Sequence, residues 1–176
     1  MATITATKSG NWSDTTVWDL ARAPLDGDTV LAETYTITFD VDVYQPNSIL
    51  NATSGHFRHS GAGVLNVTAN ANVGNHSVNG LIQNVSTGTL NFAGAIKGGS
   101  GFQASGAINA VGGTITITTC TGGSSGMAYG ANNTGAGTIT ITTCTGGSAS
   151  SAHGAYNAGV GTITITTCTG GSSSNI

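Results

Sequence analysis

Apolar and polar residues alternate in a stretch that occurs three times near the C-terminus. In the first copy, which begins at Gly113, Ile115 and Ile117 alternate with threonines. An alternation with a period of two is typical of a β-strand that has one buried and one solvated face. Gly122 and Gly123 follow, and paired glycines end a strand because they favour backbone angles outside the extended region. We therefore expect one strand in each copy, with its isoleucines facing a core.

The three copies begin at residues 113, 137 and 161, so the repeat is 24 residues long. A fixed period of this length is typical of proteins in which each repeat buries its apolar face by stacking on the next one. Fainter copies begin at Gly63 and Gly88. The sequence predicts an all-β fold, with a parallel β-solenoid (β-helix) of about 24 residues per coil. A ladder of β-hairpins, one for each repeat, is the alternative arrangement.

A second signature recurs at a constant distance from the repeats. It reads Gly-Ala-x-Asn and ends at Asn109, Asn133 and Asn157. Asparagine favours turns because its side chain bonds to the nearby backbone. The column of asparagines therefore predicts a turn in each coil.

The N-terminal residues 1–62 differ from the repeats. Trp12 and Trp18 are the chain's two tryptophans and lie close together. Large buried aromatic side chains dominate small cores, and a terminal repeat has to cover an open end. We expect three regions: an N-terminal β cap and docking module at 1–62, degenerate solenoid coils at 63–112 and the 24-residue repeats at 113–176. Between cap and coils, Val78, Leu81 and Ile82 are expected core residues.

Charged residues make up only 6% of the chain, and none follows Lys97. In a stacked solenoid identical positions lie above one another, where like charges would destabilise the ladder, so neutral coils suit this fold. The net charge of -3 and the scarcity of basic residues argue against nucleic-acid binding, which needs several Lys or Arg side chains. No apolar run is long enough to span a bilayer.

Three cysteines, Cys120, Cys144 and Cys168, occupy the same position of the repeat. Because free cysteine is among the most buried residue types, we expect them to fill the core as a column. Cysteines on adjacent coils would also satisfy the spacing of a disulfide, although three thiols cannot all pair within one chain.

Side chains that could support catalysis or metal binding are few. The carboxylate pairs that glycoside hydrolysis or Ca²⁺ binding would need are all N-terminal: Asp26, Asp28, Asp40 and Asp42. Turn and strand-end roles explain these aspartates equally well. His56 and His59 are three residues apart on an expected strand and so point to opposite faces, which disfavours a shared metal. We expect a non-enzymatic protein with no catalytic residue, no cofactor and no metal site.

Two positions of the repeat vary between copies. One holds Ser105, Tyr129 and His153, and the other holds Ile108, Asn132 and Tyr156. A strict repeat tolerates variation where side chains face outward, and surface positions of this kind carry binding functions. Tyr129, His153 and Tyr156 are therefore candidates for contact with a glycan or another partner, and a purely solvent-facing role is the alternative.

Several motifs resemble a known group of proteins. Gly-Asn-Trp-Ser-Asp at 10–14, Pro-Leu-Asp-Gly-Asp-Thr-Val at 24–30, Thr-Ile-Thr-Phe-Asp-Val-Asp at 36–42 and the Gly/Thr-rich repeats are similar to parts of bacteriophage virion fibre and decoration proteins. The N-terminal motifs are also similar to some bacterial β-helix adhesins. The resemblance implies a trimeric or solenoidal appendage, of the tail-fibre or head-fibre type, and carries over no catalytic residue.

The sequence favours a structural virion protein of a bacteriophage, a projecting fibre or surface decoration used in host or glycan adhesion. Residues 1–7 lack the features of an export signal, as expected for a protein that assembles in the host cytoplasm and is released by lysis. We expect residues 1–62 to bind other virion proteins, the coils to meet a host surface glycan, and the chain to form a homo-oligomer, with a trimer favoured.

Two further functions remain open. Regularly spaced threonines on one face of a solenoid would suit an ice-binding protein, because strand geometry spaces their hydroxyl and methyl groups about 7 by 4.8 Å. A secreted bacterial adhesin or a self-assembling extracellular filament is the third hypothesis, since an uncovered terminal strand can pair with another chain.

Overall fold

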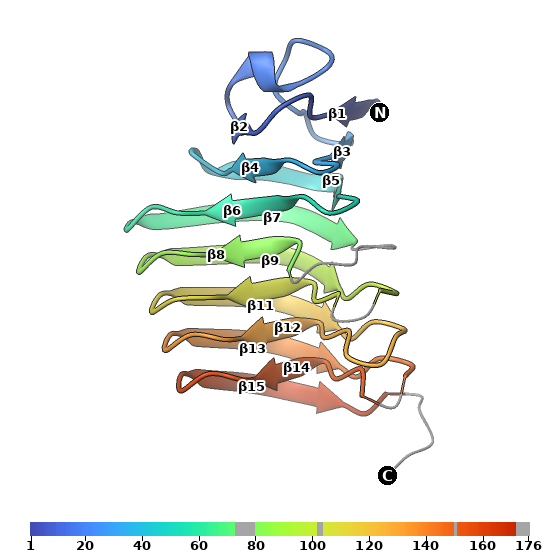
Figure 1. The fold of residues 1–176 in the computed structure, drawn as a ribbon, viewed down its shortest axis with the longest axis vertical. Helices are drawn as coiled ribbons and strands as arrows, with labels where there is room; N and C mark the ends of the chain where they lie inside the picture. Colours follow the sequence, from blue (N-terminus) through green and yellow to red (C-terminus); the bar gives the residue numbers. More distant parts are fainter. Residues whose placement is uncertain (73–79, 102–103, 150, 172–176) are drawn as a thin grey trace.

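The structure is a computed structural model, which describes residues 1–72, 80–101, 104–149 and 151–171. Its strands form two parallel sheets that face each other along the length of the molecule (Figure 1). The larger sheet contains, in spatial order, β1 (Thr3–Thr5), β3 (Thr29–Leu31), β5 (Val43–Asn51), β7 (Val64–Asn72), β9 (Thr89–Lys97), β11 (Thr114–Thr121), β13 (Thr138–Thr145) and β15 (Thr162–Thr169). The smaller sheet contains β2 (Gly10–Asn11), β4 (Thr36–Thr38), β6 (His56–His59), β8 (Ile82–Asn84), β10 (Ala107–Asn109), β12 (Ala131–Asn133) and β14 (Ala155–Asn157).

Successive strands of the chain alternate between the two sheets, so each short strand and the long strand after it make one coil (Figure 1). The ladders are parallel, for example β11 with β13 and β10 with β12. A stack of hairpins would give antiparallel pairs. The predicted β-solenoid is therefore confirmed, and the hairpin ladder is wrong.

The repeats stack in register. Thr114 pairs with Thr138, Ile115 with Ile139 and Cys120 with Cys144, a shift of 24 residues at each position. The same register continues from β13 to β15. Identical side chains therefore form columns that run along the solenoid.

The isoleucines of these columns form the core, as the alternation predicts. Ile115, Ile117, Ile139 and Ile141 are fully buried, whereas the threonines between them face outward. Cys120 and Cys144 are also fully buried, and their Sγ atoms are 3.3 Å apart. The hydrogen bond that Cys120 donates to Cys144, together with burial, raises the pKa of the Cys120 thiol well above its ordinary value. These two thiols are thus core residues, while Cys168 on the last strand is exposed, and all three are free.

Glycines of the repeat lie where successive coils come closest. A Cβ on Gly137 would lie 2.0 Å from the carbonyl oxygen of Gly113, and a Cβ on Gly123 would lie 2.0 Å from that of Gly99. No side-chain carbon fits at such a distance. Gly123 of the glycine pair therefore does more than end a strand, because it lets neighbouring backbones approach, as Gly137 does just before β13.

The asparagine column makes the predicted turn. Asn109 donates from Nδ2 to the carbonyl oxygen of Gly113 at 2.8 Å, and Asn133 donates to that of Gly137 at 3.0 Å. Asn157 makes the same bond to Gly161. Each side chain thus closes the bend between a short strand and the following long strand.

The N-terminal region covers one end of the solenoid. Trp12 and Trp18 are buried and pack edge to face with ring centroids 5.5 Å apart, and Trp18 Nε1 donates to the carbonyl oxygen of Trp12. A short 3-10 helix, η1 (Thr15–Val17), lies between them. Phe39 and Phe57 continue this aromatic cluster into the core. The expected boundary at residue 62 interrupts neither sheet, because β1 to β6 belong to the same two sheets as the later strands.

Of the core residues expected before the coils, Leu81 and Ile82 are fully buried. Val78 lies outside the described residues.

Candidate functional site

Three aromatic rings stack on one another at the last two coils. Tyr129 lies in the loop before β12, His153 lies in the equivalent loop before β14, and Tyr156 lies on β14. Tyr129 stacks on Tyr156 with centroids 4.5 Å apart and planes 18° apart, and on His153 with 5.9 Å and 10°. The three residues that the sequence singled out therefore form one cluster of stacked rings, which is the candidate contact surface.

Backbone contacts between coils fix these rings. The N–H of Gly130 donates to the carbonyl oxygen of His153 at 3.2 Å, so the loop of one coil is bonded to the loop of the next. Gly130 has to be glycine because a Cβ there would lie 2.5 Å from the oxygen of Gly154. The ring of Tyr129 is consequently held one coil above those of His153 and Tyr156.

The three rings differ in exposure. Tyr129 is only 6% exposed, whereas Tyr156 is 41% exposed and His153 is also exposed. Burial, and to a smaller extent the neighbouring Tyr156, raise the pKa of Tyr129, so its hydroxyl stays protonated. Tyr129 therefore supports the surface from inside, and His153 and Tyr156 are the rings that a partner could touch.

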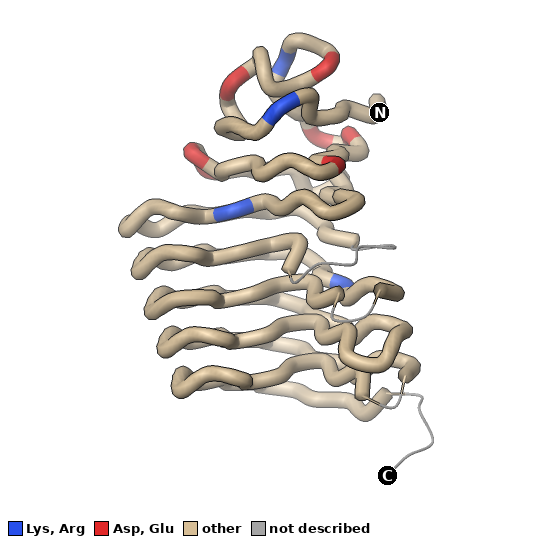
Figure 2. Tube along the Cα trace, viewed as in Figure 1, with Lys and Arg blue, Asp and Glu red and all other residues tan. Residues whose placement is uncertain are grey.

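The coils that carry the rings contain no Asp, Glu, Lys or Arg, since none follows Lys97 in the sequence, and Lys97 itself lines a groove with Gly146 and Ser148. Figure 2 shows the acidic residues gathered in the N-terminal coils, while basic residues extend as far as Arg58 on β6 and Lys97 on β9. The rings and their own coils thus offer aromatic faces and tyrosine hydroxyls, without an Asp, Glu, Lys or Arg side chain.

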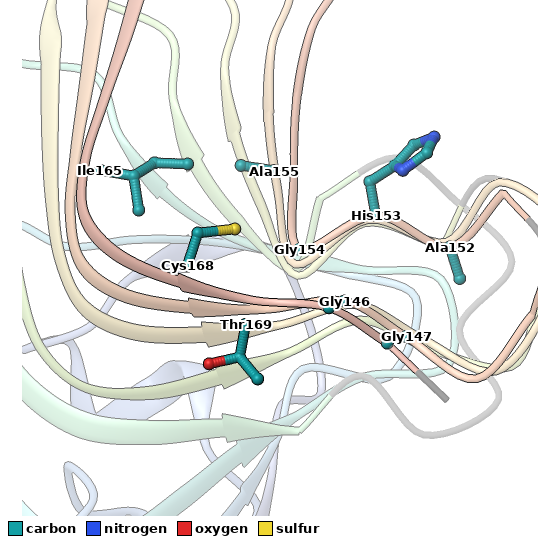
Figure 3. A pocket seen from close by; sticks show the side chains of 11 residues that line it. Gly146, Gly147, Ala152, His153, Gly154, Ala155, Ile165, Cys168 and Thr169 are labelled. Carbon is teal, nitrogen blue, oxygen red and sulfur yellow. The ribbon is translucent and has the colours of Figure 1, made fainter. Parts of the chain in front are cut away.

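A hollow of about 410 Å³ lies at the same end of the molecule, inside the last coil (Figure 3). The side chains of Ala155, Ile165 and Cys168 point into it, and the His153 ring points away from it. Its apolar lining is the continuation of the core columns. His153 nevertheless belongs to the lining of the hollow, so the hollow and the contact surface adjoin at this residue.

The N-terminal aspartates do not come together as a site. Asp26 accepts hydrogen bonds from the backbone and side chain of Asn47, and Asp42 accepts them from Asn66 in the same way. Asp40 accepts from Ser13. Each contact joins two successive coils, and among the described residues no cluster of His, Cys, Asp or Glu could hold a metal ion. These carboxylates act as links between coils, which the sequence reasoning missed because their partners lie 20 to 30 positions away.

Asp28 is the most constrained of the four. It forms an ion pair with Arg22 at 2.7 Å and accepts from the N–H groups of Ala2 and Leu25. The hydrogen bond from Arg22 and these backbone bonds lower the pKa of Asp28 to about 2, against the opposing effect of burial. The side chain therefore fastens the N-terminus to the first coils as a carboxylate.

His56 and His59 point to opposite faces of β6, as expected, and share no ligand position. His59 pairs with Asn84 of the next coil and contacts the carbonyl oxygen of Gly63 through Nε2 at 3.2 Å. Asn84 makes the equivalent bond to Gly88. His59 is thus a member of the turn column, and the signal that could have revealed it is the glycine four residues further on.

The outer face of β11, β13 and β15 carries columns of threonine. Thr114, Thr138 and Thr162 form one column, and Thr116, Thr140 and Thr164 form the next. Parallel strands lie about 4.8 Å apart and alternate residues about 7 Å apart. The hydroxyl and methyl groups are therefore regularly spaced in two directions.

These features define a parallel β-solenoid with a covered, charged N-terminal end and neutral later coils. No family model, curated protein or solved structure matches the chain. No helix in the described ranges has the length and apolarity that crossing a membrane requires.

Proposed function

We propose that the protein is a non-enzymatic structural rod on the surface of a bacteriophage particle, docked through residues 1–62 and projecting its neutral coils. The observation that carries the proposal is the separation of charge along the solenoid: every acidic residue lies between Asp14 and Asp42 (Figure 2). Charged and polar groups give an interface its register and specificity, whereas neutral stacked coils suit a shaft.

The coils after Lys97 have no carboxylate that could serve as a general acid or base. The aspartates of the N-terminal coils are engaged one by one in contacts between coils, such as Asp26 with Asn47 and Asp42 with Asn66. Acid–base hydrolysis of a glycosidic bond uses two carboxyl groups on either side of the bond. The arrangement therefore supports a structural and adhesive role.

Immunogold labelling of intact particles tests the docking. Antibodies against residues 138–145 should label intact particles, because the later coils project. Antibodies against residues 1–62 should label only disrupted particles, because the docked face is covered. Particles that stay bare with the first antibody would refute a virion location, and equal labelling by both antibodies on intact particles would refute docking through the N-terminal region.

The threonine columns support a second candidate function, binding to ice. The in-register grid on β11, β13 and β15 presents hydroxyl and methyl groups at regular intervals, and no charged residue interrupts it. Purified protein should then show thermal hysteresis that Thr140→Lys abolishes. Thr87→Lys, an exposed position in the turn between β8 and β9, is the matched control and should leave the hysteresis unchanged. Absence of hysteresis in the unmodified protein would refute this function.

A further inference from the structure

We propose that His153 and Tyr156 form a platform that binds an uncharged sugar ring of a surface polysaccharide. The inference rests on the proposed adhesive role and deepens it by naming the ligand class and the two residues that contact the ligand.

The two rings lie side by side. Their planes differ by 16° and their centroids are 6.4 Å apart, while both rings are nearly parallel to Tyr129. If they lay on opposite faces of Tyr129, two stacking distances of about 3.5 Å each would separate them by at least about 7 Å. They therefore share one face of Tyr129 and form a nearly flat surface two rings wide.

Both rings of this pair are exposed. Tyr156 on β14 is 41% exposed, and His153 in the loop before β14 is exposed as well. By contrast, Tyr129 is 6% exposed because the next coil covers it. The buried tyrosine fixes the orientation of the two exposed rings, so little side-chain freedom is lost when a ligand binds.

The chemistry of the platform favours a neutral carbohydrate. The face of an aromatic ring carries partial negative charge, so it attracts the weakly positive C–H groups on the apolar face of a pyranose. No charged residue follows Lys97, so the two coils that carry the rings supply neither a Lys or Arg for an acidic sugar nor an Asp or Glu for a cationic ligand. The phenolic hydroxyl of Tyr156 can donate to or accept from a sugar hydroxyl.

Calorimetry with the full chain tests the proposal. The probes are hexasaccharides of glucose, mannose and galactose, with an oligomer of an acidic sugar for comparison. We expect at least one neutral hexasaccharide to bind, and Tyr156→Ala and His153→Ala each to weaken its affinity at least tenfold. Tyr44→Ala is the matched control, since Tyr44 is 79% exposed on β5, far along the sheet from β15, and should leave the affinity unchanged.

Three calorimetric results would each overturn the platform: no binding of any neutral hexasaccharide, binding of the acidic oligomer alone, or undiminished binding by Tyr156→Ala. Sedimentation of the unmodified chain and of Tyr156→Ala tests whether a second copy of the chain, in place of a sugar, packs against the two rings. If the unmodified chain is a dimer that sugar does not dissociate, and Tyr156→Ala is a monomer, the rings pack against a second copy and the proposal is wrong. Unchanged thermal unfolding of Tyr156→Ala shows that any loss of binding is local.

The platform and the virion role can fail separately. If the chain binds sugar but the immunogold antibodies leave the particles unlabelled, only the virion role is refuted. If the particles are labelled but the chain binds no sugar, only the platform is refuted.

Discussion

At the scale of single residues, one hydrogen bond recurs at the same place in successive coils. The side chains of Asn84, Asn109, Asn133 and Asn157 each donate to the carbonyl oxygen four residues further on. His59 occupies the same column and, since a carbonyl oxygen only accepts, must donate through a protonated Nε2. Two different side chains thus satisfy the same backbone acceptor.

This equivalence predicts the effect of two substitutions at one site. His59→Asn should keep the bond to Gly63, and its free energy of unfolding should stay within about 1 kcal/mol of that of the unmodified protein. His59→Ala should be about 1–2 kcal/mol less stable than His59→Asn, because the carbonyl loses its donor. Urea unfolding followed by circular dichroism measures both values. Equal destabilisation by the two variants would show that the hydrogen bond contributes little to stability.

At the scale of secondary structure, β13 and β15 have the same sequence and different environments. Ile139 and Ile141 on β13 are fully buried, while Ile163 and Ile165 on β15 are only partly buried. A solenoid strand is covered by the coils on both of its sides, and β15 has a described neighbour on one side only. Burial is therefore a property of position in the stack as much as of sequence.

Truncation of the equivalent isoleucines should show this difference. Ile139→Ala should destabilise the protein by about 3 kcal/mol, because it removes a buried side chain and leaves a cavity. Ile163→Ala should cost less than half as much, because Ile163 is partly exposed. Thermal or urea unfolding provides the comparison, in which each variant serves as the other's control. Equal losses would mean that the last coil is covered in solution.

At the scale of the whole molecule, the two ends are held together by different interactions. The first coils are joined by carboxylates, among them Asp28 with the N–H of Ala2, Asp26 with Asn47 and Asp42 with Asn66. The coils after Lys97 rely on neutral columns and close backbone contact. Acid should consequently affect the two ends unequally.

The pKa of Asp28 is lowered to about 2, so its contribution of about 2 kcal/mol is present above pH 4 and is lost as the pH falls from about 4 to 2. Hydrogen bonds from Asn47 and Asn66 lower the pKa values of Asp26 and Asp42. Protonation of these two carboxylates at low pH therefore also lowers the stability of the first coils. Because Trp12 and Trp18 are the only tryptophans, their fluorescence reports the N-terminal end, and far-ultraviolet circular dichroism reports all coils.

We expect the tryptophan signal to change between pH 4 and 2 at a temperature where the sheet signal persists. Asp28→Asn should already be destabilised at neutral pH and should show a weaker pH dependence. Coincident changes of both signals in the unmodified protein would indicate that the ends unfold as one unit.

The sequence by itself determined the strands, the 24-residue coil, the isoleucine and cysteine columns and the asparagine turns, because alternation and spacing along the chain are local properties that each copy repeats. Only the tertiary structure decided which side chains meet across coils: the stack of Tyr129, His153 and Tyr156, the aspartate links, the role of His59 and the exposure of Cys168. The physical reason is that a side chain in a solenoid is covered or left open by residues about one coil away and by its distance from an end. The repeat pattern is the same for buried Cys144 and exposed Cys168, so no pattern along the chain could distinguish them.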